Sequence, residues 1–192
     1  MNEPQLELTS DEMRVSYENQ ATDEDYIDNN YNVNRGHLFP SCHSGDEVTA
    51  RSTFTLTNAV PQKISFNSGS WNRLEIKAIE VMDNYCRDKK DQNKVLAHVL
   101  TGAVPNKDKK QQLKDRVNIP SSMWMTFCCY NSTSSSWASQ AYWALNKDEK
   151  LNDNVMISEI SLKKLQEILS KNFEKNTQLF KNDCENKIVK SL

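Results

Sequence analysis

Hydrophobic residues along the chain change their spacing, and each spacing predicts a different element. Between residues 71 and 85 they recur every three or four positions, which is typical of one face of an amphipathic helix. We expect this helix to begin near residue 70 and to run to about residue 89. The same spacing between residues 162 and 173 predicts a second helix late in the chain.

Short runs rich in β-branched and aromatic residues predict four strands. Between them lie polar segments: the first 30 residues, and a Lys-rich connection, residues 106–118, with Leu113 as its one apolar anchor. Because the predicted strands are mostly neighbours in sequence and the helices are few, the pattern predicts the α+β class. The expected strands are residues 53–57, ending in the turn around Pro61; 95–104, closed by Pro105; and 122–130 and 137–145, which flank the Ser-rich turn 131–136 and should form a hairpin.

The length of 192 residues and the mass of 22.1 kDa are those of one domain. We expect a single unit over residues 1–192, made of an acidic segment (1–30), a core (31–174) and a frayed tail (175–192). Hydrophobic residues make up 37% and charged residues 26%, with a mean hydropathy of -0.76, so the chain should fold with long polar loops. No run approaches the roughly 18 apolar residues that cross a bilayer, and the first ten residues lack the features of a signal peptide.

Charge is nearly balanced overall but unevenly distributed. The net charge of -2, from 24 basic and 26 acidic residues, excludes a global basic field that would attract nucleic acid. Residues 1–33 hold nine acids and one base, a net -8, whereas residues 86–116 hold nine bases and four acids, a net +5. The basic run has two interpretations, a solvated loop or a face that steers phosphate groups.

Five cysteines form an odd set, so at least one must stay outside any intramolecular disulfide. Cys128 and Cys129 are adjacent and would point to opposite faces of a strand, so we expect them not to pair with each other. The chain has no CxxC spacing, which excludes zinc-ribbon and thioredoxin-like sites. Asn131 begins a glycosylation sequon that matters only in the secretory route.

A set of polar residues at fixed separations marks the candidate site. Taken singly, each has a common structural explanation: a core histidine, a helix cap for Asn67, turn chemistry for residues 58–61, and an ion pair with Arg73 or Lys77 for Glu75. Their joint spacing favours a shared function. The set consists of Asn34-Arg35-Gly36-His37, then Asn58-Ala59-Val60-Pro61-Gln62 beginning 21 residues after His37, then Asn67 at 30 residues, and Glu75 eight residues later.

This combination resembles the DNA/RNA non-specific endonucleases, the sugar-nonspecific ββα-metal (His-Me finger) nucleases. The hallmark of that family is Asp-Arg-Gly-His, then Asn-x-x-Pro-Gln, then Asn with a helical Glu eight residues on. A vertebrate subgroup also shares the segment 116–120, Trp124, the segment 127–130 and Trp137. The resemblance implies a ββα-metal fold of the α+β class, with a mixed or antiparallel sheet and flanking helices, here without the N-terminal strands of the family.

The chemistry of phosphodiester hydrolysis fits these residue types. A neutral imidazole, with a reference pKa of about 6.5, can take a proton from water, which makes His37 the candidate general base, and Gly36 would let the backbone approach a phosphate. The resemblance implies Arg35 as a catalytic phosphate contact and Asn58 as a second substrate contact. It also implies Asn67 as the ligand of Mg²⁺ or another divalent cation such as Mn²⁺, with Glu75, about 80° away on an ideal helix, holding waters of the ion.

Two functions follow from these observations. The first, which the resemblance implies, is a divalent-metal-dependent endonuclease that cuts DNA and RNA with little sequence preference, leaves 5′-phosphate ends and is expected to be secreted, as members of the resembled family are. The second is a catalytically degenerate member that only binds nucleic acid or protein. Asn34, which stands where the family usually has Asp, removes a negative charge near His37 and favours the second. The oligomeric state is left open by the sequence.

Overall fold

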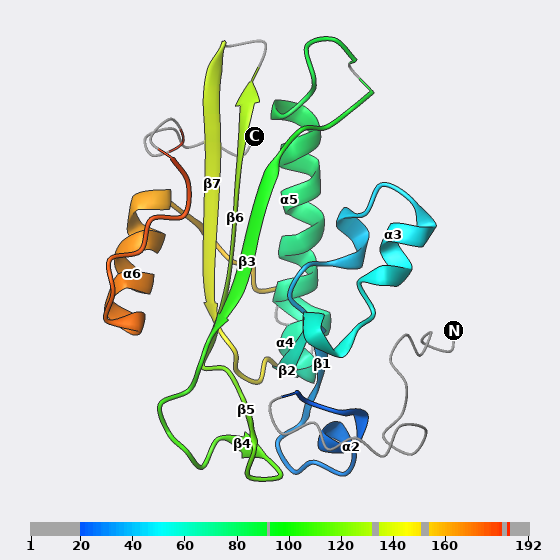
Figure 1. Ribbon diagram of the computed structural model, residues 1–192, viewed down its shortest axis with the longest axis vertical. Helices are drawn as coiled ribbons and strands as arrows, with labels where there is room; N and C mark the ends of the chain where they lie inside the picture. Colours follow the sequence, from blue (N-terminus) through cyan, green and yellow to red (C-terminus); the bar gives the residue numbers. More distant parts are fainter. Residues whose placement is uncertain (1–19, 92, 132–134, 151–153, 182–183, 185–192) are drawn as a thin grey trace.

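The computed structural model describes residues 20–91, 93–131, 135–150, 154–181 and 184. Helices and strands alternate irregularly along these residues (Figure 1). In chain order they are α2 (Asp23–Tyr26), β1 (Val33–His37), η1 (Ser41–His43), α3 (Glu47–Ser52), η2 (Leu56–Asn58), β2 (Ala59–Lys63), α4 (Ile64–Phe66), the π-helical η3 (Asn67–Trp71), α5 (Asn72–Tyr85), β3 (His98–Val104), β4 (Gln112–Leu113), β5 (Val117–Asn118), β6 (Ser122–Asn131), β7 (Ser136–Leu145), β8 (Glu159–Ile160) and α6 (Leu162–Phe173).

An antiparallel sheet with the order β3-β6-β7-β8 forms the centre of the fold. The hairpin predicted for residues 122–130 and 137–145 is confirmed, with Trp124 opposite Trp143 in the register of β6 and β7. Three residues of its turn, 132–134, lie outside the described part of the chain. The strand predicted for residues 95–104 is confirmed but begins at His98.

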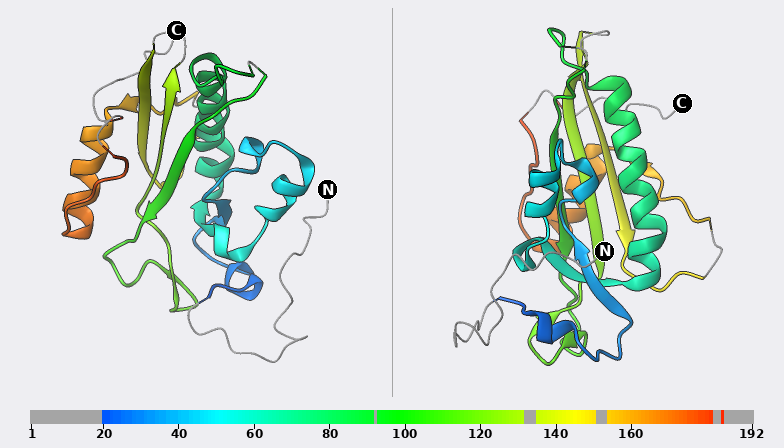
Figure 2. Two further views of the ribbon diagram at one scale, coloured as in Figure 1. Left: turned by 45° about the horizontal axis from the view of Figure 1, so that its top comes forward. Right: turned by 90° about the vertical axis from the view of Figure 1, so that its right-hand side faces the viewer.

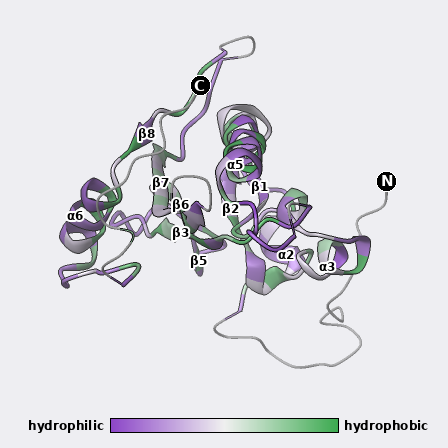
Figure 3. Ribbon diagram, turned by 90° about the horizontal axis from the view of Figure 1, so that it is seen from above, coloured by the Kyte–Doolittle hydropathy of each residue, from purple (hydrophilic) through white to green (hydrophobic). Residues whose placement is uncertain are grey.

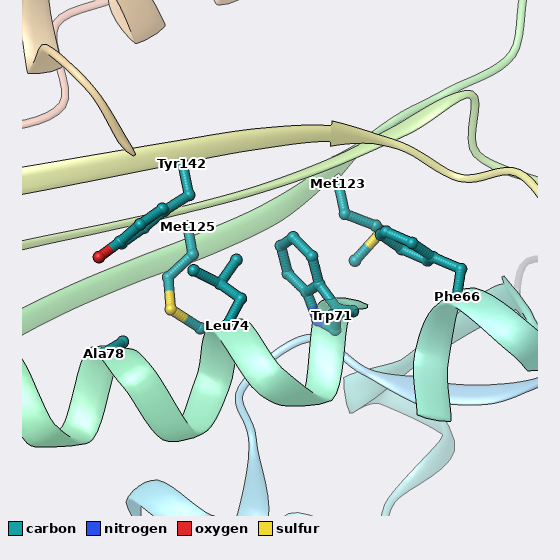
Figure 4. Close-up of a cluster of buried hydrophobic side chains, with 7 residues drawn as sticks. All are labelled: Phe66, Trp71, Leu74, Ala78, Met123, Met125 and Tyr142. Atoms are coloured by element: carbon teal, nitrogen blue, oxygen red, sulfur yellow. The ribbon is translucent and has the colours of Figure 1, made fainter. Parts of the chain in front are cut away.

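The two long helices cover opposite faces of this sheet (Figures 1 and 2). Seen from above in Figure 3, the sheet lies between α5 and α6. Leu165 and Leu169 of α6 pack against Val104 and Ala141 on one face. On the other face, α4, η3 and α5 pack against β6 and β7 (Figure 4), through the buried side chains of Phe66, Trp71, Leu74, Ala78, Met123, Met125 and Tyr142.

Both predicted helices are confirmed. The apolar face that the spacing of hydrophobic residues predicts for each helix is the face that packs against the sheet. Full burial of each large apolar side chain contributes about 1.5–3 kcal/mol, enough to fix which face of a helix meets the sheet. The first helix ends at Tyr85, earlier than expected, and Cys86 follows it as the C-cap. None of the described helices is long and apolar enough to cross a membrane.

The strand predicted for residues 53–57 is wrong. Thr53 caps the end of α3, and the segment continues into η2. The strand lies immediately afterwards, as β2, and pairs antiparallel with β1. Alternation would give a strand here one apolar face, but the Asn58 side chain holds the segment in a loop by donating a hydrogen bond to the Thr53 carbonyl. Pro61 lies within β2, opposite Arg35, in a two-stranded ladder where its missing N–H is tolerated.

The cysteines behave as their positions predict. Cys128 and Cys129 do not pair with each other: Cys129 is bonded to Cys86 at the end of α5, and Cys128 to Cys184. Cys42 is a free, exposed thiol. Leu113, the predicted anchor of the connection 106–118, is a buried residue of the short strand β4. It packs against β5 and against the N-terminal part of the described chain.

Candidate active site

The β1–β2 hairpin and the segment that leads into α5 carry most of the candidate residues, and one contact, between Asn34 and Asn67, joins the two parts. β1 carries the Asn-Arg-Gly-His motif, and β2 follows it in the antiparallel hairpin. β2 leads without a gap into α4, η3 and α5, so the hairpin lies beside the N-terminal end of α5 (Figures 1 and 2). Two strands followed by a helix therefore form one continuous unit around the motif.

Asn34 and Asn67 are in direct contact. The Nδ2 atom of Asn67 donates a hydrogen bond of 3.0 Å to the Oδ1 atom of Asn34. This contact replaces the helix-capping role considered for Asn67. It uses the nitrogen end of the Asn67 amide, so the oxygen end remains available as a ligand for a cation.

The segment that carries Asn67 is not the regular helix that the sequence predicts. Residues 67–71 form a π-helical turn, with a kink at Gly69 where φ is -102° and ψ is -115°. The expected angle of about 80° between Asn67 and Glu75 assumed an uninterrupted α-helix and does not apply across this turn. Turns of this kind are frequent at functional sites.

Glu75 lies in the first turn of α5 and is half-buried. Burial raises the pKa of its carboxyl group from an ordinary value of 4.5 to about 7, and the nearby Trp71 indole partly opposes this rise. The two cations considered as its partners are engaged elsewhere: Lys77 with Glu80 at 3.7 Å, and Arg73 with the carbonyl of Val155 at 2.9 Å. Glu75 is thus a carboxyl group that changes charge near neutral pH.

The loop after β1 contacts this part of α5. His43 Nε2 lies 3.1 Å from the backbone carbonyl of Glu75, and because a carbonyl only accepts, the imidazole donates. Burial lowers the pKa of His43, which keeps the ring neutral. Although Cys42 is exposed, partial desolvation by its surroundings and the neighbouring Glu75 charge both raise the pKa of its thiol, so the thiol is not activated.

His37 is the last residue of β1, and its position is set by Gln62. Its backbone carbonyl accepts a hydrogen bond of 3.1 Å from Gln62 Nε2, and its ring meets Phe54 edge to face with 4.6 Å between centroids. Gln62 is fully buried. A Cβ atom at Gly36 would overlap the Gln62 side chain, so this glycine makes room for Gln62, and approach of a phosphate to its backbone stays a prediction. The sequence signal for Gln62 is its place as the last residue of the Asn-x-x-Pro-Gln motif, but residue type and spacing alone indicate no role for it.

Arg35 holds the N-terminal helix α2 in place. Its Nη1 atom lies 2.7 Å from Asp23 Oδ1, and its guanidinium lies 5.8 Å from the centre of the Tyr26 ring. Side chains alternate along a strand, so Arg35 shares a face of β1 with His37, opposite the face that carries Asn34 and Gly36. A phosphate contact by Arg35 stays a prediction, and Asp23, which engages the Nη1 atom, would compete with the phosphate for the guanidinium.

Asn58 ties two loops together through its side chain. Its Oδ1 atom accepts from the Phe39 N–H at 3.0 Å, while Nδ2 donates to the carbonyls of Phe39 and Thr53 at 2.9 and 3.0 Å. These contacts agree with the turn role considered from the sequence. A substrate contact by Asn58 stays a prediction.

The donor chemistry of the site fits a hard, hydrated cation. Asn67 offers an amide oxygen and Glu75 a carboxylate, and oxygen ligands are those that Mg²⁺ prefers. The described residues contain no cluster of three or more His, Cys, Asp or Glu side chains that could hold a metal ion. A softer ion such as Zn²⁺, which takes three or four protein ligands, therefore fits less well.

Comparison with known proteins places this arrangement in context. Residues 9–180 match the family model described as DNA/RNA non-specific endonuclease. The chain is 30% identical over 165 residues to the Endonuclease domain-containing 1 protein of Mus musculus, covering 86% of this chain and 28% of that protein. It is 28% identical over 149 residues to a nuclease of Nostoc sp., covering 74% of this chain and 50% of that protein. The chain thus spans half or less of these relatives.

The fold has a solved counterpart. A crystal structure of the EndoG/EndoGI complex contains a chain that superposes with a TM-score of 0.61 and 17% sequence identity, covering 83% of this chain and 63% of that one. With this likeness, the α+β fold expected from the sequence is confirmed.

Proposed function

We propose that this chain, which belongs to the DNA/RNA non-specific endonuclease family, is a divalent-metal-dependent endonuclease that hydrolyses DNA and RNA with little sequence preference. The observation that carries the proposal is the hydrogen bond between Asn34 and Asn67, because it joins the strand that ends in His37 to the turn before Glu75. An oxidising, extracellular location stays a prediction, and the two disulfides support it.

Each residue has a distinct role in this proposal. His37 takes a proton from the attacking water, and the Gln62 hydrogen bond to its backbone holds the end of β1 that carries the imidazole. Asn67 and Glu75 would hold Mg²⁺ or Mn²⁺, Asn67 directly and Glu75 through water. The bound cation supplies positive charge beside the scissile phosphate and the leaving oxygen. Arg35 would add a second positive charge once it leaves Asp23.

A second function, binding without cleavage, is favoured by two contacts. Asn34 accepts the Asn67 hydrogen bond as an aspartate would, but it brings no negative charge to the cation. Arg35 is engaged by Asp23. Both features weaken catalysis without removing a basic surface, since Lys107, Lys109 and Lys110 are exposed in the connection 106–118. Such a protein would bind nucleic acid in a salt-sensitive way and leave it intact.

A plasmid-nicking assay decides between the two. Supercoiled DNA and a single-stranded RNA are incubated with the chain in Mg²⁺, in Mn²⁺ and in EDTA. Endonuclease function predicts cleavage of both substrates that EDTA stops, that His37→Ala abolishes and that Asn67→Ala reduces by at least about a hundredfold. His98→Ala, which changes an exposed histidine of β3, is the matched control and should cut normally. Binding without cleavage at any metal concentration would support the second function.

A further inference from the structure

A carboxylate from the loop after β7 binds the π-helical turn that carries Asn67. Glu149 Oε2 accepts a hydrogen bond of 2.9 Å from the Ser70 backbone N–H, and Oε1 accepts one from the Ser70 hydroxyl. The backbone N–H of Glu149 donates to Ser65 Oγ at 2.9 Å. One residue therefore holds the chain on both sides of Asn67.

The surroundings of Glu149 are built for a charged group. Its side chain is only 10% exposed, and a buried carboxylate is costly unless donors and a counter-charge meet it. Ser70 provides two donors, and Arg73 Nη2 lies 4.0 Å from Oε2. A Cβ atom at Gly69 would overlap Oε2, so a glycine at this position is what allows the carboxylate to come so close.

The loop that presents Glu149 is itself fixed to the hairpin and the sheet. Asn146 accepts from the Lys63 N–H at 2.8 Å and donates to the carbonyls of Pro61 and Pro120 at 3.0 and 2.9 Å. Asp148, two residues further on, lies 3.1 Å from Lys63 Nζ, but its side chain is exposed and such an ion pair contributes little to holding the loop. The place of Glu149 is thus determined by β2 and by the central sheet, which makes it a rigid support for the turn.

We propose that Glu149 is a positioning residue that keeps the Asn67 amide oriented for a divalent cation. The role of the cation rests on the proposed function. A π-helical turn contains one more residue than an α-helical turn, so its conversion to α-helix would shift Asn67 by one position, about 100° of rotation, relative to Asn34. By binding Ser70, Glu149 holds the turn in the form in which Asn67 meets Asn34.

Three variants of the full chain test this role. Glu149→Ala removes the acceptor, whereas Glu149→Gln keeps an oxygen for the Ser70 N–H and can donate to the hydroxyl oxygen. Asp148→Ala, in the same loop but away from the turn, is the matched control. Two readouts are used: the side-chain amide resonance of Asn67 in the metal-free protein, by NMR, and Mn²⁺ affinity, by electron paramagnetic resonance of the free ion.

We expect Glu149→Ala to shift the Asn67 resonance and to weaken Mn²⁺ binding about tenfold or more, as loss of an outer-shell support does. In Glu149→Gln, the Asn67 resonance and the Mn²⁺ affinity should both stay close to those of the unmodified chain. In Asp148→Ala, both should be unchanged. If Glu149→Ala does not fold, Ser70→Ala removes only one of the two hydrogen bonds and should weaken Mn²⁺ binding about threefold.

The outcomes separate this inference from the proposed function. An unchanged Asn67 resonance and unchanged Mn²⁺ affinity in folded Glu149→Ala overturn the positioning role. Failure of the unmodified chain to bind Mn²⁺ or to nick DNA overturns the proposed function, while the Asn67 resonance still shows whether Glu149 orients the amide. An equal loss of Mn²⁺ affinity in Asp148→Ala would also count against the role, because it would point to a general effect of loop charge.

Discussion

The side chain of Gln62 lies over Gly36 and reaches along β1 to the carbonyl of His37. The two residues are neighbours across the hairpin, since Gly36 pairs with Val60 and Gln62 with Asn34. Because Gly36 has no side chain, Gln62 can reach the His37 carbonyl and support the end of β1.

This relationship predicts a compensating pair of substitutions. Gly36→Ala should lower the free energy of unfolding by about 1–3 kcal/mol, because the new methyl group displaces Gln62. Adding Gln62→Ala should recover part of that loss, so the two effects should not be additive. Urea unfolding of the single and double variants measures the coupling. Strict additivity would show that Gly36 and Gln62 do not compete for the same space.

Restoring a carboxylate at position 34 should strengthen cation binding. In Asn34→Asp the Asn67 hydrogen bond can persist while a negative charge is added next to the proposed ligand. We expect about tenfold tighter Mn²⁺ binding, and faster nicking, from the added electrostatic attraction. Asn34→Ala, which removes the acceptor of the Asn67 hydrogen bond, serves for comparison and should weaken binding. Equal affinity in all three proteins would place the cation away from Asn34.

Glu75 should make the stability of the metal-free protein depend on pH. Its pKa rises from 4.5 to about 7 on folding, so the folded state holds the proton more tightly between these values. The free energy of unfolding should therefore fall as the pH rises through this window and level off above it, by about 2–3 kcal/mol in total.

The measurement is urea unfolding in EDTA at pH 5 and pH 8, carried out on the unmodified chain and on the comparison variant Glu75→Gln. The glutamine cannot ionise, so it should unfold with nearly the same free energy as the unmodified chain at pH 5 and be the more stable of the two at pH 8. Parallel pH profiles for the two proteins would mean that Glu75 does not titrate in this range.

Release of Arg35 from Asp23 should increase binding of nucleic acid. The ion pair is about two-fifths exposed on each side, so its loss should change stability by less than about 1 kcal/mol. In a His37→Ala background, which prevents cleavage, Asp23→Asn should tighten binding of a labelled oligonucleotide several-fold and steepen its salt dependence. Fluorescence anisotropy over a range of salt measures this. Asp46→Asn, at the start of α3, controls for the change of net charge.

Local patterns account for the elements that the sequence predicted well. The helices at residues 72–85 and 162–173 and the β6–β7 hairpin each carry a regular apolar face that tertiary packing simply buries. The segment 53–57 has an alternating pattern too, but Asn58 binds it to the loop after β1, and side-chain to backbone hydrogen bonds of this kind cannot be inferred from spacing. β1 was missed because its five residues are mostly polar.

By itself, the sequence determined the family and the α+β class, and it predicts His37, Asn67 and Glu75 as site residues, because each depends on residue type and on spacing along the chain. The tertiary structure alone decided which side chains support them. Asn67 meets Asn34 across 33 positions, Gln62 meets His37 across 25, and Glu149 meets Ser70 across 79. Contacts over such distances depend on how the hairpin, the π-helical turn and the sheet pack together, and no local pattern encodes that packing.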